Sequence, residues 1–415
     1  MYRYLLSMVV GVAIATVGVG AAAADDSSVS VLDEKQFVAA LEAADPRLAR
    51  LAAEVYAAEA EVGVEGVRIN PSLSFDREEL FPENGTAATN YARVTWPLDV
   101  SGRRGRRMAA ARSAAAAVSA DSDMARFEIL VDGLRIFNQA AYARLRVELS
   151  RTEREALVRA VDVVRRRTSA GAASGYDLQR IELELAAYDD QIATVETELL
   201  AARSELAALL GQANGLVDAE SSLELPAPPA PLDGDSSTIL ANRSDLRAAQ
   251  LRAQSADQRA AAASRGWVPD LGLAMGVMSS DVGDQTAIGY TLGLSITLPI
   301  FDRGGAQAAR ARATRRVAEA EARVIETRAP AIVRARHATL ARRIEQARTL
   351  AEGQLSRLDT LLKTAETGYR EGESSVVELL DAYQTARETR LRNLELRRDA
   401  RLAELDLWRA LGRRP

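Results

Sequence analysis

The sequence contains no cysteine and a single histidine, His337, among its 415 residues. Without cysteine, the chain has no disulfide, no thiolate ligand for a metal and no residue for lipoprotein attachment. One imidazole does not build a metal site alone, and the few methionines are too scattered to relay soft metal ions. The composition therefore predicts neither a resident metal nor another cofactor.

Aromatic residues are also scarce, at 5% of the chain, whereas alanine, leucine, arginine and glutamate are abundant. This composition is typical of long helices packed side by side, so we expect an elongated, mainly α-helical protein. The net charge of −5 is mild and spread along the chain, which does not favour nucleic-acid binding. The sequence also lacks a Gly-x-Ser-x-Gly motif, a phosphate-binding glycine loop and a histidine-paired nucleophile. We therefore expect neither an enzyme nor a nucleic-acid partner.

Long apolar runs are confined to the N-terminus. Arg3 is followed by a mostly apolar segment, 5–24, whose last three alanines precede Asp25 and Asp26. This pattern predicts a secretory signal peptide at 1–24. The alternative is an uncleaved anchor, because about 20 apolar residues can span a bilayer. No later segment predicts a membrane helix, so an exported chain of this kind is periplasmic, secreted or an outer-membrane β-barrel.

The rest of the chain contains one pattern twice. Gly171 and Gly372 lie in matching segments 201 residues apart, and Pro71 and Pro269 lie in matching segments 198 residues apart. We therefore predict a tandem duplication joined by an extended, proline-rich linker. The predicted domains are a first structural repeat at 25–224, the linker at 225–238 and a second structural repeat at 239–415.

Each repeat has the same predicted order of helix, strand, strand, long helix and return helix. The long helices, about 104–169 and 306–370, match the summed length of one return helix and one first helix. We therefore expect 176–210 to continue into 239–266 and 374–411 to continue into 34–67, which gives four helical columns. Pro330 predicts a kink or a local break in the second long helix.

The strands carry a period-two pattern that is typical of membrane β-strands. From Ile288 to Leu298, large apolar residues alternate with small or polar ones, as in a strand with lipid on one face and a lumen on the other. Trp96 and Trp267 lie at strand ends, where indole rings suit the membrane–water interface. The alternative is a pair of soluble hairpins. Because four strands cannot close a membrane barrel and open edges cannot face lipid, a membrane location requires several chains in one barrel.

The duplicated plan and the segment 369–382, Tyr-Arg-Glu-Gly-Glu-Ser-Ser-Val-Val-Glu-Leu-Leu-Asp-Ala, resemble the TolC-like outer-membrane efflux family. The segments 96–107 and 298–305 are similar to its cobalt–zinc–cadmium (CzcC-like) branch, although Gly305 replaces the usual asparagine. The resemblance implies a mainly α fold with a small β part. In that family a homotrimer forms a 12-stranded β-barrel in the outer membrane, continued across the periplasm of a Gram-negative bacterium by a 12-helix α-barrel.

The resemblance further implies a passive conduit that receives its cargo from a periplasmic adaptor and an inner-membrane pump. Divalent metal cations are the cargo that the CzcC-like segments favour. Two alternatives stay open at this point. One is a drug or type I secretion channel of the same family, and the other is a periplasmic coiled-coil adaptor or scaffold.

The two helix reversals are candidate contact sites. Glycine suits such reversals, and Ser174 and Ser375 are placed to cap the return helices in capping boxes. The resemblance implies that both turns form the periplasmic tip that contacts the adaptor. The residues concerned are Gly171, Ala172, Ala173, Ser174, Gly372, Glu373, Ser374 and Ser375.

Three acidic residues near the tip correspond to the family's pore gate: Asp177, Glu378 and Asp381. In a trimer they would form rings of carboxylates, which attract cations at a constriction. The alternative is ordinary solvated acids on a charged helix. The family's basic residue near the turn is replaced by Ser374, so the closing contacts are expected to differ. The arginines at 103, 104, 106 and 107 are expected to meet lipid phosphates, to line the pore mouth or to begin a solvated helix.

Overall fold

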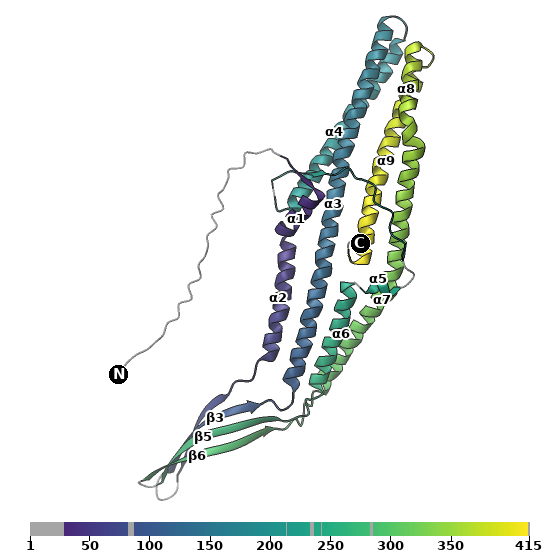
Figure 1. The fold of residues 1–415 in the computed structure, drawn as a ribbon. Helices are drawn as coiled ribbons and strands as arrows, with labels where there is room; N and C mark the ends of the chain where they lie inside the picture. The colour runs from purple at the N-terminus through teal and green to yellow at the C-terminus, as the bar shows by residue number, and fades with distance from the viewer. Residues whose placement is uncertain are drawn as a thin grey trace, which may run out of the picture.

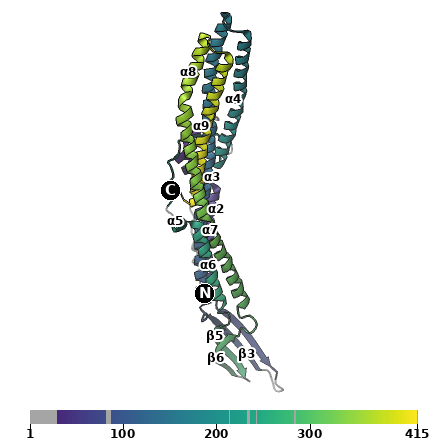
Figure 2. The same cartoon turned by 90° about the vertical axis from the view of Figure 1, so that its right-hand side faces the viewer.

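The computed structural model describes residues 29–81, 87–212, 214–232, 236–241, 243–282 and 285–413. The predicted signal peptide at 1–24 lies outside these residues. The described chain is a long array of helices with a four-stranded sheet at one end (Figure 1). After a quarter turn the array is narrow, and helical hairpins form the end opposite the sheet (Figure 2).

The two halves of the chain repeat one order of elements, as the sequence predicts. The first half contains β1 (Ser30–Asp33), α1 (Glu34–Ala44), α2 (Pro46–Gly66), β2 (Ser72–Leu80), β3 (Ala87–Leu98), α3 (Arg103–Ser169), α4 (Gly175–Leu209) and β4 (Val217–Glu220). The second half contains α5 (Ser236–Leu240), α6 (Ser244–Ala263), β5 (Asp270–Val282), β6 (Gln285–Thr297), α7 (Gly305–Leu350), the π-helix η1 (Ala351–Leu355), α8 (Ser356–Glu371) and α9 (Val376–Leu411). We call α3–α4 near their turn the first hairpin and α8–α9 the second hairpin.

The first predicted helix of each repeat is divided in two. In the first repeat, Asp45 separates α1 from α2, and its Oδ1 accepts a hydrogen bond from the Arg47 amide at 2.8 Å. Pro46 begins α2, where its missing N–H costs no helical hydrogen bond. The single helix predicted at 34–67 is therefore wrong, because Asp45 and Pro46 together start a new helix.

The second long helix is interrupted, but not at its proline. α7 continues through Pro330, whose side chain is buried. A proline removes one helical hydrogen bond, and the bonds on either side keep the helix intact. The predicted local break at Pro330 is wrong, and the interruption is instead η1, which contains Gly353. The first long helix, α3, has no such segment.

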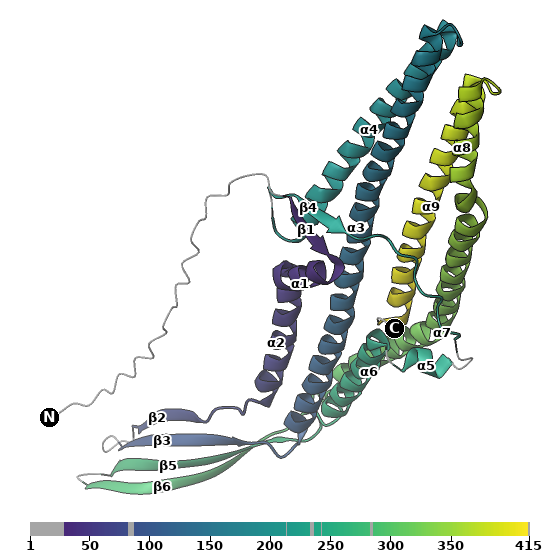
Figure 3. The same ribbon diagram turned by 45° about the horizontal axis from the view of Figure 1, so that its top comes forward.

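Each return helix stacks on the first helices of its own repeat. Arg243, the residue before α6, donates a hydrogen bond to the Ala410 carbonyl near the end of α9. Leu206 of α4 packs in one cluster with Phe37 of α1. Figure 3 shows the same arrangement, with α4 above α1 and α9 above α6. The predicted exchange of columns between repeats is therefore wrong.

In the first repeat, a short strand pair holds the return helix on the first helices. β4 follows α4 and pairs in parallel with β1, which precedes α1, so the end of α4 is held beside the start of α1. The sequence analysis missed both strands, because four residues are too few to show a period-two pattern. Beyond β4 the described part of the predicted linker has no helix or strand until α5.

The four remaining strands form one antiparallel sheet in the order β2-β3-β5-β6. Val94 lies opposite Leu73 on one side and Met275 on the other, and Met275 lies opposite Leu292. Directly opposed residues share a face of the sheet, so this register collects the apolar series of both repeats on one face. Within the described residues, no helix combines the length and the apolarity needed to cross a membrane.

Candidate functional site: the apolar sheet, the junction and the helical tips

One face of the sheet is apolar and uncovered in the single chain. On β6, the side chains of Ile288, Tyr290 and Leu292 are 83%, 81% and 70% exposed. The other face of the sheet carries Arg93 of β3 and Thr291 of β6. Both are paired across the strands with Gly276 of β5. A contiguous exposed apolar face of this kind marks contact with lipid or with another protein.

The two tryptophans predicted at the membrane interface lie at the helical end of the sheet. Trp96 is near the end of β3, opposite Leu273, and is 59% exposed. Trp267 lies in the turn between α6 and β5 and is 64% exposed. Both rings are thus exposed near the end of the sheet that adjoins the helices, and their contact with lipid stays a prediction.

The arginines that begin α3 bind neighbouring elements of the same chain. The contacts are Arg103 with Asp270, Arg104 Nε with the Gly66 carbonyl at 2.6 Å, Arg106 with Gln258 at 3.4 Å and Arg107 with Glu65 at 3.1 Å. They connect α3 to α2, α6 and β5. These side chains therefore tie the sheet to the helices, and the interpretation of a simple solvated helix start is wrong.

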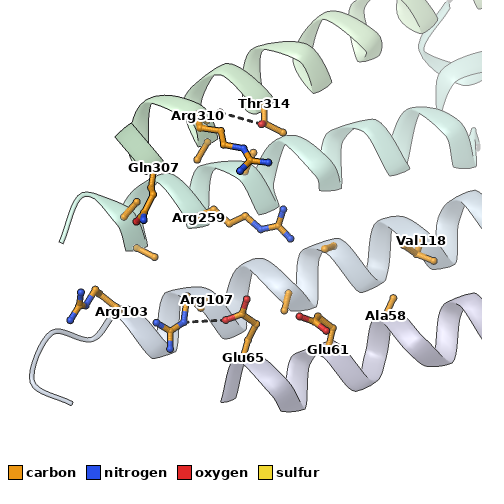
Figure 4. Close-up of a pocket in the computed structure, with 16 residues that line it drawn as sticks. Ala58, Glu61, Glu65, Arg103, Arg107, Val118, Arg259, Gln307, Arg310 and Thr314 are labelled. Atoms are coloured by element: carbon orange, nitrogen blue, oxygen red, sulfur yellow. Dashed lines mark hydrogen bonds and ion pairs between the residues drawn. The ribbon is translucent and has the colours of Figure 1, made fainter. Parts of the chain in front are cut away.

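A hollow of about 690 Å³ lies beside this junction, between α2, α3, α6 and α7. Figure 4 shows the Arg107–Glu65 ion pair on its wall and Arg259 and Arg310 on the facing helices. Arg103 also lines this hollow. The expectation that these arginines line a pore mouth requires a closed assembly, and it stays a prediction.

The tips reverse the chain as the sequence predicts. Gly171 and Gly372 have φ angles of 72° and 84°, in the left-handed region that glycine adopts without strain. Ser174 Oγ accepts from the Asp177 amide at 3.1 Å, and Asp177 Oδ2 accepts from the Ser174 amide at 3.1 Å. This is the predicted capping box, and it fixes the start of α4.

The second tip has the same construction. The Ser375 amide donates to Glu378 Oε2 at 2.7 Å, and the Glu378 amide donates to Ser375 Oγ at 3.3 Å. Two of the three predicted gate carboxylates, those of Asp177 and Glu378, therefore bind their own turns. Asp381 lies one turn further along α9 and is exposed. The gate function of these three residues stays a prediction.

The two hairpins meet at a contact that the sequence analysis missed. Arg167, in the last turn of α3, donates to the Ala172 carbonyl at 3.1 Å, and its guanidinium lies 4.8 Å from the ring centroid of Tyr369 on α8. Burial raises the pKa of Tyr369, nearby Asp177 raises it further, and Arg167 lowers it. No local sequence motif predicts this contact, because its two residues belong to different repeats.

Further from the tips, aromatic residues are packed between the hairpins. The Tyr383 hydroxyl donates to Glu366 Oε1 at 2.6 Å, and burial together with this bond raises the pKa of Tyr383. The Arg387 guanidinium lies 4.8 Å from the centroid of the Tyr188 ring, whose pKa burial raises to about 12. The interface is therefore a buried layer of tyrosines edged by charges.

This layer contains one buried acid, Glu153, which is 6% exposed. Its nearest cation is Arg390, at 4.0 Å between Nη1 and Oε1. Burial raises the pKa of Glu153 to about 7, and Arg390 and Arg387 lower it only in part. The sequence held a signal for this residue, since Glu153 lies four residues before Leu157 on the buried stripe of α3.

Among the described residues, no group of three or more histidine, cysteine, aspartate or glutamate side chains is placed to hold a metal ion.

Residues 38–212 and 236–413 match the family described as outer membrane efflux protein. These segments make up most of the chain, so the chain belongs to the outer membrane efflux protein family. The resemblance drawn from segment 369–382 is thereby confirmed. The protein is an efflux channel of this family and not an enzyme.

Several named proteins are similar to this chain. The chain is similar to the cobalt-zinc-cadmium resistance protein CzcC of Cupriavidus metallidurans, with 26% identity over 337 residues covering 78% of this chain and 77% of that protein. The nickel-cobalt-cadmium resistance protein NccC of Alcaligenes xylosoxydans xylosoxydans is 27% identical over 342 residues, covering 76% and 70% respectively. The fold matches the outer-membrane channel OprN with a TM-score of 0.74 and 22% identity, covering 91% of this chain and 89% of that one.

Proposed function

We propose that three copies of this chain form one closed channel in the outer membrane. The observation that carries the proposal is the open sheet with an exposed apolar face. Its outer strands, β2 and β6, have no partner on one side within the described residues. Open strand edges are unstable in lipid, so β2 of one copy would pair with β6 of the next, and three sheets would close into twelve strands.

The outer columns of the helical part support the same assembly. Beside the sheet, α2 packs against α3, α3 against α6 and α6 against α7, so α2 and α7 are the outer helices. Tyr56 and Val64 of α2 are 75% and 62% exposed, and Val317 and Val324 of α7 are 59% and 48% exposed. Contact between α2 of one copy and α7 of the next would bury these side chains and surround a tunnel extending into the periplasm.

The cargo that we propose is a divalent metal cation, delivered by an inner-membrane pump through a periplasmic adaptor that contacts the helical tips. The support is similarity to two proteins named for resistance to cobalt, cadmium and related metals. Export of drugs or polypeptides through a channel of the same family is the second candidate.

Assembly and cargo are tested separately. Trimeric assembly predicts that the protein fractionates with outer membranes and migrates as a heat-sensitive trimer in SDS. Recovery of a monomer from the soluble periplasm would overturn it, and would restore the adaptor or scaffold interpretation. For the cargo, deletion of the gene should lower tolerance to zinc, cadmium or cobalt, whereas loss of antibiotic tolerance alone would favour a drug channel.

A further inference from the structure

The buried carboxylate between the two hairpins differs from the other buried acids of the described chain. Asp45 lies 2.6 Å from Arg47, and Asp218 is bonded to Arg203. Glu153 Oε1, in contrast, has no hydrogen-bond partner. A buried acid without a close partner is stable mainly in its protonated form.

Charged and polar groups from three helices surround Glu153. α9 contributes Arg387 and Arg390, and α4 contributes Tyr188, which interacts with it electrostatically. Arg390 Nη1 lies 4.0 Å from Glu153 Oε1, and Arg390 is also bound by α8, because its Nη2 donates to Asp359 at 3.0 Å. Arg387 is likewise stacked on Tyr188. The two cations that partly neutralise Glu153 are therefore shared with other groups, and both belong to the second hairpin.

The second hairpin is joined to α7 through an irregular helical segment. η1 ends at Leu355, four residues before Asp359, and interrupts the helix that continues from α7 into α8. π-Helical segments inside α-helices are rare and often mark functional positions. The corresponding helix of the first repeat, α3, is continuous. The second hairpin is thus joined to the body through a π-helical segment that the first hairpin lacks.

We propose that Glu153 is a pH-sensitive element that controls the contact between the two hairpins. The packed contact accommodates the protonated side chain, whereas the carboxylate is stable only when water reaches it. Because the packed state binds the proton more tightly than a separated state with solvated Glu153, rising pH favours separation, with the second hairpin moving at η1. The consequence for the pore rests on the proposed channel, since separation at the tips would widen a closed assembly.

The absence of cysteine permits a direct test by spin labelling. Ala172→Cys and Glu373→Cys place one label on each tip, and an excess of the cysteine-free chain leaves one labelled copy per assembly. Double electron–electron resonance at pH 5 to 8 should show the ratio of long to short distances rising by up to about tenfold per pH unit below pH 7. In Glu153→Gln the short distance should persist at every pH, and Asp359→Asn, which frees Arg390, should weaken the response.

Glu155→Gln is the matched control, because Glu155 is an exposed acid on the same helix. It should keep the native response. Distances that do not change with pH in the native chain, or that respond equally in Glu153→Gln, would overturn the inference. A pH-dependent distance in a protein that forms no conducting pore would instead contradict the proposed channel and leave the hairpin contact as inferred.

Discussion

Arg167 at the end of α3 covers the ring of Tyr369 at the end of α8, with 4.8 Å between the guanidinium carbon and the ring centroid. The contact joins the two hairpins one turn from their tips, and Tyr369 is only 3% exposed. Arg167 also lies 3.1 Å from the position that a Cβ of residue 372 would occupy. One side chain from the first repeat therefore supports the turn of the second.

Replacing Arg167 by glutamine should loosen this tip contact. A cation–π contact in a partly desolvated place contributes roughly 1 kcal/mol, which corresponds to about a five-fold change in an equilibrium. We expect single channels in planar bilayers to open spontaneously about five times more often than the native protein. Arg167→Lys, which keeps the charge, should have a smaller effect. An unchanged opening frequency in Arg167→Gln would show that this contact does not restrain the pore.

The predicted gate is tested by the double variant Glu378→Gln with Asp381→Asn. Glutamine at position 378 still accepts the capping bond from Ser375, so the turn should keep its structure. Loss of two carboxylate rings should weaken cation selectivity and block by divalent ions, because such rings concentrate cations at a constriction. Reversal potentials in a salt gradient measure the selectivity. If they match those of the native channel, these residues are solvated acids and not a gate.

The junction between sheet and helices offers a matched pair of glycines. Gly304 has φ +76°, and a Cβ there would lie 2.2 Å from the Ala263 carbonyl oxygen. Gly304→Ala should therefore displace the start of α7 and lower the free energy of unfolding by at least about 1 kcal/mol. The melting temperature of the assembly should fall accordingly. Gly305→Ala meets open space in a helix and should be neutral or slightly stabilising. Equal melting temperatures for both variants would refute this view of the junction.

Glu153 predicts a pH-dependent stability whose sign follows from its raised pKa. The folded state keeps the proton up to about pH 7, whereas an unfolded glutamate loses it near pH 4.5. Stability contributed by this group is therefore present at pH 4 and is lost as pH rises toward 7. The shift corresponds to a cost of about 3 kcal/mol at most above pH 7. Glu153→Gln should melt at the native temperature near pH 4 and above it at pH 8, as circular dichroism would show.

The local elements followed from the sequence because their causes are local. The long helices come from runs of good helix formers, the reversals from Gly171 and Gly372, and the capping boxes from serine followed by an acid three residues later. The strand pattern likewise placed the apolar series that forms the exposed face. These signals depend on neighbours in the chain, so one sequence contains all of them.

The tertiary structure alone decided which parts meet. It stacked each return helix on its own repeat, in the first repeat through β1 and β4, and it placed the interruption of the second long helix at η1 and not at Pro330. It also brought Arg167 to Tyr369 and left Glu153 Oε1 without a hydrogen-bond partner. Such contacts join residues up to hundreds of positions apart, and burial and pairing there depend on how helices pack in space. Periodicity along the chain can show which face of a helix is buried, but not which residues meet there.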